Sequence, residues 1–235
     1  KYFTLLPLFV FIITDVLIYL TGERTAISLM FITAFILIIF SNNFKFLRLI
    51  SIIISTLLII LITILSPQVK ERNITKTIEQ VGGTGSTEIR YLSNEHHSLA
   101  ITSINAFMEN PIFGHGANTY RVTCLNKDFA FDHRSCSTHP HNTYLQIASE
   151  LGIIGLLFLF YIIFIILKKL LSKILLFKKK DVKQFSDYQL CLICSYILPL
   201  VPILPSLDFF NNWHNAIIYL PLGFLLQDIY KDKKS

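Results

Sequence analysis

The sequence contains little charge. Only 15% of its 235 residues are Asp, Glu, Lys or Arg, whereas a typical globular chain carries about 25%. Hydrophobic residues make up 53% and the mean hydropathy is +0.57, which excludes a disordered chain. The four cysteines are too few for a small secreted scaffold that is built on disulfides. The composition therefore predicts a membrane protein.

Several functional motifs are also missing. No Gly-rich phosphate loop ending in Lys and Ser or Thr occurs, and the Gly-rich stretch at residues 82–85 follows no predicted strand, so nucleotide binding is unsupported. No His-Glu-x-x-His motif is present, and Cys191 and Cys194 lie in an apolar run without a second ligand pair, which favours packing over metal binding. The net charge of +6 comes from short clusters between apolar runs, so we expect no nucleic-acid partner.

The apolar residues form long runs that predict an all-α, polytopic membrane helix bundle. A bilayer core of about 30 Å needs roughly 17 to 25 apolar residues in a helix. Five runs meet or approach this length, and a sixth is short and contains Pro221 and Gly223. In chain order they are Phe3 to Leu20, Ala26 to Phe40, Leu49 to Leu65, Leu151 to Leu167 (with a helix start near Thr143), Leu190 to Leu204 and His214 to Ile229.

The positions of Lys and Arg predict the orientation of these spans, because short basic loops stay in the cytoplasm. The basic clusters fall between the second and third runs, between the fourth and fifth, and at the end of the chain. We therefore expect three transmembrane helices in residues 1–66, a long extracytoplasmic loop with short helices in residues 67–142, and two to three transmembrane helices with basic cytoplasmic segments in residues 143–235. The chain lacks an initiating Met and begins almost inside its first span, so we expect it to be a fragment without its N-terminal part.

All seven histidines fall on the predicted outer side. Loops accept His more readily than membrane spans do, which is the simple explanation. The segment His139-Pro140-His141-Asn142 is more specific, because it directly precedes the fourth span. Pro140 disfavours helix at the residue before it, and Asn142 is a suitable N-cap. At the positive end of that helix, a neutral His141 is a candidate to take a proton from a hydroxyl group.

Two acidic residues are predicted at membrane depth, where an ionisable group is expensive. Glu150 falls on one helical face with Asn142, Gln146 and Ser149. We expect it to face the bundle interior and either to pair with a cation or to orient a catalytic neighbour. The same reasoning applies to Asp15 in the first span, although near a membrane edge its side chain can also reach the headgroups.

The outer segments contain further candidates. Arg24 lies in a short outer turn and Arg90 in the long loop. Each alone is a salt-bridge partner or headgroup anchor, but convergence with His141 would make a phosphate site, since Arg offers a bidentate fork. Residues 100–108 have the spacing of an amphipathic helix ending at Asn110-Pro111, expected on the membrane surface or capping the bundle. In an oxidising compartment, Cys124 and Cys136 are able to close a small disulfide loop.

Two of these segments resemble a known family. The run from His139 to Gln146, continued by Glu150-Leu151-Gly152 and Gly155, is similar to the signature of the O-antigen ligase and polymerase superfamily. The segment Glu109 to Gly116 resembles the family's Asn-Pro-x-x-Gly-x-Gly turn. The turn Thr21 to Thr25 and the Arg90 segment resemble the family's two arginine sites.

The resemblance implies a multi-pass enzyme of the bacterial inner membrane, of the GT-C kind, with the long loop in the periplasm. Such enzymes move a glycan from an undecaprenyl diphosphate carrier to an acceptor hydroxyl, such as that of the lipid A core, and need no cofactor or metal. Arg24 and Arg90 would bind the diphosphate and His141 would act on the acceptor or the leaving group. His139, Asn142, Glu150 and His115 would bind substrate or support the site.

Several alternatives stay open. The superfamily joins ligases, polymerases that extend the glycan and protein O-oligosaccharyltransferases, and no motif separates them, although a ligase is the first choice. From another class, Asp15, Glu150 and the three prolines of the fifth run (Pro199, Pro202, Pro205) would suit a proton-coupled transporter or flippase. A membrane zinc hydrolase and a glycan-binding structural protein are weaker candidates.

Overall fold

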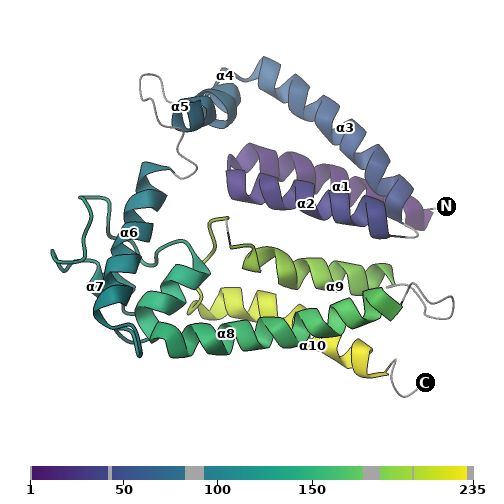
Figure 1. Ribbon diagram of the computed structural model, residues 1–235. Coiled ribbons are helices and arrows are strands. Elements are labelled where there is room, and N and C mark those ends of the chain that lie inside the picture. The colour runs from purple at the N-terminus through teal and green to yellow at the C-terminus, as the bar shows by residue number, and fades with distance from the viewer. Residues whose placement is uncertain (1, 42–43, 83–92, 177–185, 203, 232–235) are drawn as a thin grey trace. The chain divides into compact units, whose positions relative to one another are not determined.

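The computed structural model describes residues 2–41, 44–82, 93–176, 186–202 and 204–231, and every regular element in these ranges is helical (Figure 1). The helical class predicted from the sequence is thus confirmed for the described residues. The elements are α1 (Tyr2–Thr21), α2 (Arg24–Phe40), α3 (Phe44–Leu65), α4 (Pro67–Lys70), a π-helical turn (Glu71–Thr75), α5 (Lys76–Gly82), α6 (Asn94–Glu109), α7 (Tyr120–Thr123), α8 (Thr143–Leu176), α9 (Asp187–Ile197), a 3-10 turn (Leu198–Leu200) and α10 (Asn212–Lys231).

The chain divides into two compact units, which are described separately. The first contains residues 1–91, 185–198 and 227–235, and the second contains residues 92–184 and 199–226. In the first unit α1 and α2 lie side by side (Figure 1) and both contact α3. The Ser41 hydroxyl after α2 donates to Asp187 Oδ1 at 2.8 Å, which joins α2 to the first turn of α9.

A buried ion pair holds α1 against α3. Both terminal nitrogens of the Arg48 guanidinium donate to the Asp15 carboxylate at 2.8 Å, and the Ser55 hydroxyl donates to Asp15 Oδ2 at 3.0 Å. Asp15 is 2% exposed and Arg48 is 3% exposed. The expectation that Asp15 pairs with a cation is therefore confirmed. Arg48 belongs to the basic cluster between the second and third apolar runs, which was used to predict the orientation, and it is a partner inside the helix packing instead of a loop charge.

The apolar runs become helices of unequal length. Among the described residues, Lys45–Leu65 and Thr143–Lys168 are long and apolar enough to cross a membrane, whereas Leu5–Thr21, Arg24–Phe40 and Asp187–Leu200 are shorter apolar helices. The prediction of one continuous helix from Leu190 to Leu204 is wrong. Helix α9 ends at Ile197 and a 3-10 turn follows, because the prolines at 199 and 202 remove backbone donors that a helix needs. The number of membrane spans and their orientation stay predictions.

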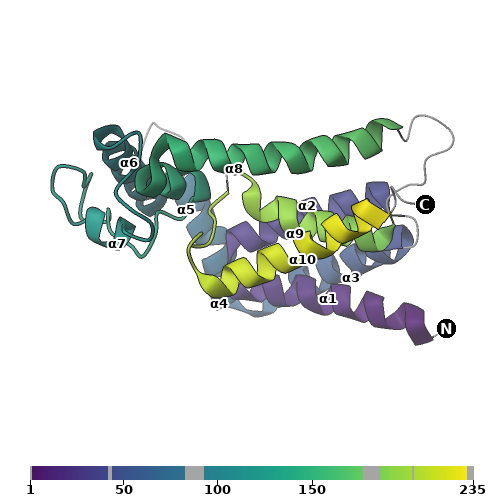
Figure 2. The same ribbon diagram turned by 90° about the horizontal axis from the view of Figure 1, so that it is seen from below.

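In the second unit, α6 packs against the N-terminal part of α8, and α7 also contacts α8 (Figure 2). The helix expected over residues 100–108 is present, since α6 covers this range and ends at Glu109 with Asn110 as its C-cap. Its buried face is largely polar and consists of Ser98, Leu99, Thr102, Ser103 and Ala106. Ile104 and Met108 are exposed, so the apolar stripe seen in the sequence is not the face that packs on α8.

Candidate functional site

Asn142 starts α8, as the sequence predicts. Its Oδ1 accepts hydrogen bonds from the backbone N–H groups of Tyr144 and Leu145 at 3.0 and 3.1 Å, which satisfies two of the donors that a helix start leaves free. Its Nδ2 donates to the Pro202 carbonyl at 2.9 Å. The residue before it, His141, has a left-handed backbone with φ of 54°. This conformation is uncommon for a residue with a side chain and turns the chain sharply into the helix.

Three residues that precede α10, namely Pro202, Ser206 and Asp208, are hydrogen-bonded to the start of α8. The Ser206 N–H donates to the His141 carbonyl at 2.8 Å, and the Thr143 hydroxyl donates to the Ser206 hydroxyl at 2.8 Å. Further along α8, Gln146 Nε2 donates to Asp208 Oδ1 at 2.7 Å. The segment before α10 therefore meets the segment before α8 and the first turns of α8.

Three histidine rings gather at the same place. The ring centroids of His139 and His141 are 4.1 Å apart, and those of His96 and His141 are 5.4 Å apart. His139 is buried, and its Nε2 donates to the Ser206 carbonyl at 3.3 Å while its Nδ1 accepts from the Thr138 hydroxyl at 3.0 Å. Both nitrogens of His139 are thus engaged by protein groups. His139 supports the fold, whereas His141 is half-buried and its Nε2 lies 3.5 Å from the Ser137 hydroxyl.

A cavity of about 280 Å³ adjoins the His141 ring. Two short segments form its wall, one at the start of α6 and the other in the loop before α8. The lining residues are Glu95, His96, Leu99, Arg134, Cys136, Ser137 and His141. This volume lies near the lower end of the range for small-molecule sites, which is roughly 300 to 1,000 Å³.

The charges around the cavity favour a neutral imidazole. Burial lowers the pKa of His141 from its ordinary value of 6.5, and the nearby Glu95 carboxylate opposes this effect. Burial likewise lowers the pKa of His139, and the neighbouring His141 lowers it further. Arg134, which lines the cavity, donates hydrogen bonds that lower the pKa of the neighbouring Asp132 carboxyl to about 2. A neutral His141 is able to accept a proton.

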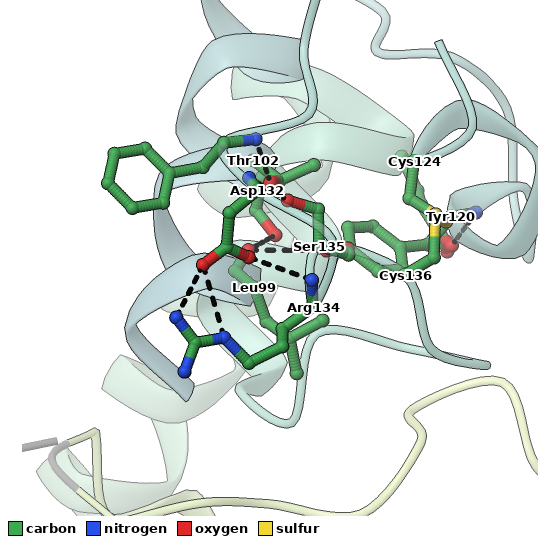
Figure 3. The surroundings of a disulfide bond; sticks show 11 residues. Leu99, Thr102, Tyr120, Cys124, Asp132, Arg134, Ser135 and Cys136 are labelled. Atoms are coloured by element: carbon green, nitrogen blue, oxygen red, sulfur yellow. Dashed lines mark hydrogen bonds and ion pairs between the residues drawn. A yellow bond between two sulfur atoms is a disulfide. The ribbon is translucent and has the colours of Figure 1, made fainter. Parts of the chain in front are cut away.

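The loop that carries Arg134 is fixed from several sides (Figure 3). Arg134 Nη2 lies 2.7 Å from Asp132 Oδ2, and the Ser135 hydroxyl accepts from the Asp132 N–H at 2.9 Å. The Thr102 hydroxyl on α6 accepts from the N–H of Phe131 at 3.2 Å. These bonds connect the loop to the helix that supplies Glu95, so the two walls of the cavity keep a fixed spacing.

Cys124 and Cys136 are joined by a disulfide (Figure 3). Cys124 is buried together with Leu99 and Tyr120. Burial raises the pKa of the Tyr120 phenol to about 12, and its hydroxyl donates to the Ser135 carbonyl at 2.9 Å. The disulfide fixes Cys136, and the Tyr120 hydroxyl fixes the Ser135 carbonyl. Both residues directly precede Ser137, so the position of Ser137 is held by these two contacts.

Residues of the Asn-Pro-x-x-Gly-x-Gly turn, Asn110 to Gly116, take the place of some of the backbone hydrogen-bond partners within α8. In a regular helix the N–H of Ile153 would donate to the carbonyl of Ser149. Here Ile153 N–H donates to the Pro111 carbonyl at 2.8 Å, and the Ser149 carbonyl accepts from the His115 N–H at 3.0 Å. The break lies at Gly152, where φ is 65° and ψ is −161°. The two motifs of the sequence therefore form a single interlocked unit.

The carboxylate of Glu150 stabilises this unit. It accepts hydrogen bonds from the backbone N–H groups of Asn118 at 2.9 Å and Tyr120 at 2.7 Å. The expected partner was a cation or a catalytic neighbour, and among the described residues the hydrogen-bond donors found are amides instead. The reason is geometric, since Tyr120 begins α7 with a free N–H and Asn118 lies just before that helix, and both N–H groups reach Glu150 on α8.

The remaining candidates are His115, Arg24 and Arg90. His115 Nε2 donates to the Ala106 carbonyl at 2.8 Å, so this ring fixes the turn. Arg24 begins α2 in the first compact unit and is exposed. Arg90 lies outside the described residues. The structure thus brings His139, His141 and Asn142 together within the second unit.

Sequence reasoning missed Glu95, Arg134 and Ser137 as lining residues. Glu95 is in the first turn of α6, where an acidic residue is ordinary. Arg134 and Ser137 are common loop residues without a spacing pattern. The only feature of the sequence that pointed to Arg134 and Ser137 as site residues was their closeness to Cys136 and His139. Within the described part of the chain, no group of three or more His, Cys, Asp or Glu is arranged to hold a metal ion.

Comparison with known proteins gives one match. No curated protein and no solved structure matches the chain. The family model described as O-antigen ligase matches residues 8–160, which is well over half of the sequence and includes both interlocked motifs. That family is membrane-embedded. The chain belongs to the O-antigen ligase family.

Proposed function

We propose that the protein is a metal-independent glycosyltransferase of the ligase type in the bacterial inner membrane, with residues 67–142 in the periplasm. It moves a glycan from an undecaprenyl diphosphate carrier to an acceptor hydroxyl, with the lipid A core as the first candidate acceptor. Family membership supports a glycosyltransferase that acts on lipid-linked glycans. The observation that carries the proposed chemistry is the half-buried His141 beside a cavity with charged and polar walls.

His141 acts as the general base. The acceptor oxygen attacks the anomeric carbon of the donor glycan, and the bond between that carbon and the diphosphate oxygen breaks. The hydroxyl proton passes to the neutral imidazole, and the undecaprenyl diphosphate leaves with the bonding electron pair. Burial lowers the pKa of His141, so the imidazole is ready to accept a proton at neutral pH.

Arg24 and Arg90 bind the diphosphate in this proposal. The leaving diphosphate gains negative charge as the bond breaks, and a planar guanidinium donates two parallel hydrogen bonds to its oxygens. Arg24 is exposed at the start of α2. A lysine at either position keeps the charge and loses the fork.

The transporter alternative receives less support. It requires Asp15 and Glu150 to exchange protons, but Asp15 accepts hydrogen bonds from both terminal nitrogens of Arg48 and Glu150 accepts from two backbone amides. Protonation of either carboxylate would weaken bonds that hold the helices and loops together.

The test compares the glycans of cells with and without the gene. A ligase predicts that loss of the gene leaves complete polymer on the lipid carrier and none on lipid A. Single repeat units on lipid A indicate a polymerase, and loss of glycan from proteins alone indicates a protein O-oligosaccharyltransferase. Unchanged glycans in all three fractions, with the gene expressed in the parent cells, refute the proposal.

A further inference from the structure

The cavity beside His141 has the composition of a sugar site. One wall carries the carboxylate of Glu95 and another carries the guanidinium of Arg134, while Leu99 and the His96 ring supply apolar and aromatic surface. A pyranose ring needs both kinds of contact, because its hydroxyl groups lie around the rim and its C–H groups lie on the faces. The volume of about 280 Å³ suits one such ring better than a longer glycan.

The charged groups keep hydrogen-bonding capacity for a ligand. Among the described residues, Arg134 donates to Asp132 from Nε and Nη2, and Nη1 makes no hydrogen bond within this part of the chain. The Glu95 carboxylate is exposed in the first turn of α6 and makes no hydrogen bond or ion pair with a described residue. An ionised carboxylate is able to accept from two neighbouring hydroxyl groups at once, and such charge-assisted bonds are stronger than neutral ones.

The position of Glu95 also relates it to the proposed base. Both Glu95 and His141 line the same cavity, and the His96 ring next to Glu95 contacts the His141 ring. A sugar held by Glu95 therefore presents its remaining hydroxyl groups within the same small volume as the imidazole. We propose that Glu95 and Arg134 form a sugar-binding subsite that places one pyranose ring against His141 and determines which sugar reacts there.

This subsite rests on the proposed function, and its sugar has two possible sources. The ring belongs either to the acceptor or to the first residue of the lipid-linked donor. The shared chemistry is a pyranose with neighbouring hydroxyl groups, and steady-state kinetics separates the sources. The substrates are an undecaprenyl diphosphate glycan and lipopolysaccharide that ends in core sugars, with the full-length protein in lipid nanodiscs.

The decisive variant is Glu95→Gln, which keeps the side-chain size and removes the charge. We expect it to raise the KM of one sugar substrate by about ten-fold or more, the effect of weakening hydrogen bonds to a charged group. A raised acceptor KM assigns the subsite to the acceptor, and a raised donor KM assigns it to the donor. Glu95→Asp should recover part of the loss because it restores the carboxylate.

The matched control is Glu109→Gln, the same change at the exposed far end of α6, which should leave both KM values as in the parent protein. If the parent protein transfers glycan and Glu95→Gln changes neither KM, the subsite is refuted and the proposed function stands. If the parent protein transfers no glycan, the proposed function fails and the subsite fails with it. A normal gel-filtration profile and an intact disulfide in Glu95→Gln show that the variant is folded.

Discussion

The α-carbon of Gly152 faces the carbonyl group of Ile112 so closely that a Cβ atom there would overlap both its carbon and its oxygen. The reverse contact also exists, since a Cβ on Gly114 would overlap the backbone of Glu150. Two glycines from segments far apart in the sequence thus allow two backbones to meet. This close approach lets residues 111–116 exchange hydrogen bonds with the broken turn of α8.

Gly152→Ala should destabilise the protein. The left-handed φ of 65° with an extended ψ suits only glycine, and such strain costs about 1–3 kcal/mol before the overlap with Ile112 is added. The measurement is thermal unfolding in detergent. Gly223→Ala is the control, because a Cβ there meets no atom within 4 Å. Equal melting temperatures for the two variants would contradict the interlocked turn.

We expect the free energy of unfolding to depend on whether each buried charge of the Asp15–Arg48 pair keeps its partner. Arg48→Met leaves a buried carboxylate without its cation and should cost about 3–5 kcal/mol of unfolding free energy. Adding Asp15→Leu should recover most of this loss, because both buried charges are then gone. The measurement is unfolding in mixed micelles. Lys45→Met, which removes an exposed positive charge from the same helix, should have little effect. A double variant less stable than Arg48→Met would refute the pairing argument.

Removal of the disulfide should loosen one wall of the cavity. Replacing Cys124 and Cys136 by Ser opens a loop with a sequence separation of 12, and closing a loop of similar length contributes about 3 kcal/mol in the chain-entropy model. Limited proteolysis between the two positions should become faster. Cys191→Ser, at a free exposed cysteine, is the control. Two free thiols in the mass spectrum of parent protein purified without reductant would exclude the bond.

Substitutions of His141 and His139 should affect different properties, the first mainly the activity and the second mainly the stability. His141→Ala should lower kcat by about 100-fold to 10,000-fold, the usual contribution of proton transfer, and leave the fold intact. His139→Ala should lower the melting temperature, because His139 donates to the Ser206 carbonyl and accepts from Thr138, and should reduce kcat less. Transfer kinetics and thermal unfolding measure both effects. An inactive His139→Ala beside a fully active His141→Ala would contradict the assignment.

The pH dependence follows from the lowered pKa values of both histidines. The unfolded chain binds protons near the ordinary value of 6.5, whereas the folded chain keeps both rings neutral to lower pH. The contribution of both histidines to the free energy of unfolding should therefore be fully present above pH 6.5. It should be lost as the pH falls through their pKa values in the folded protein. Activity should decline over the same range as His141 gains a proton. Melting temperatures and transfer rates between about pH 5 and 8 test this, and stability that increases on acidification would refute it.

Part of the site was predictable because it depends on neighbours within a few residues. The start of α8 at Asn142 follows from Pro140 and the cap, and the end of α6 follows from Asn110 and Pro111. Capping acts over one turn of helix, so the local sequence contains all the atoms involved. The buried state of Asp15 and Glu150 was predictable for the same kind of reason, since a charge within a long apolar run has to find donors in the protein.

The sequence alone determined a helical, apolar chain with the O-antigen ligase motifs in order, whereas the tertiary structure decided which groups meet. The Glu150 carboxylate holds amides about thirty residues earlier, and Glu95 and Arg134 share a cavity although nearly forty residues separate them. Such pairs depend on how α6 and the loop before α8 pack, and that packing depends on side chains spread over the whole second unit. Local patterns specify helix ends and buried faces, but contacts between distant segments exist only after the chain has packed.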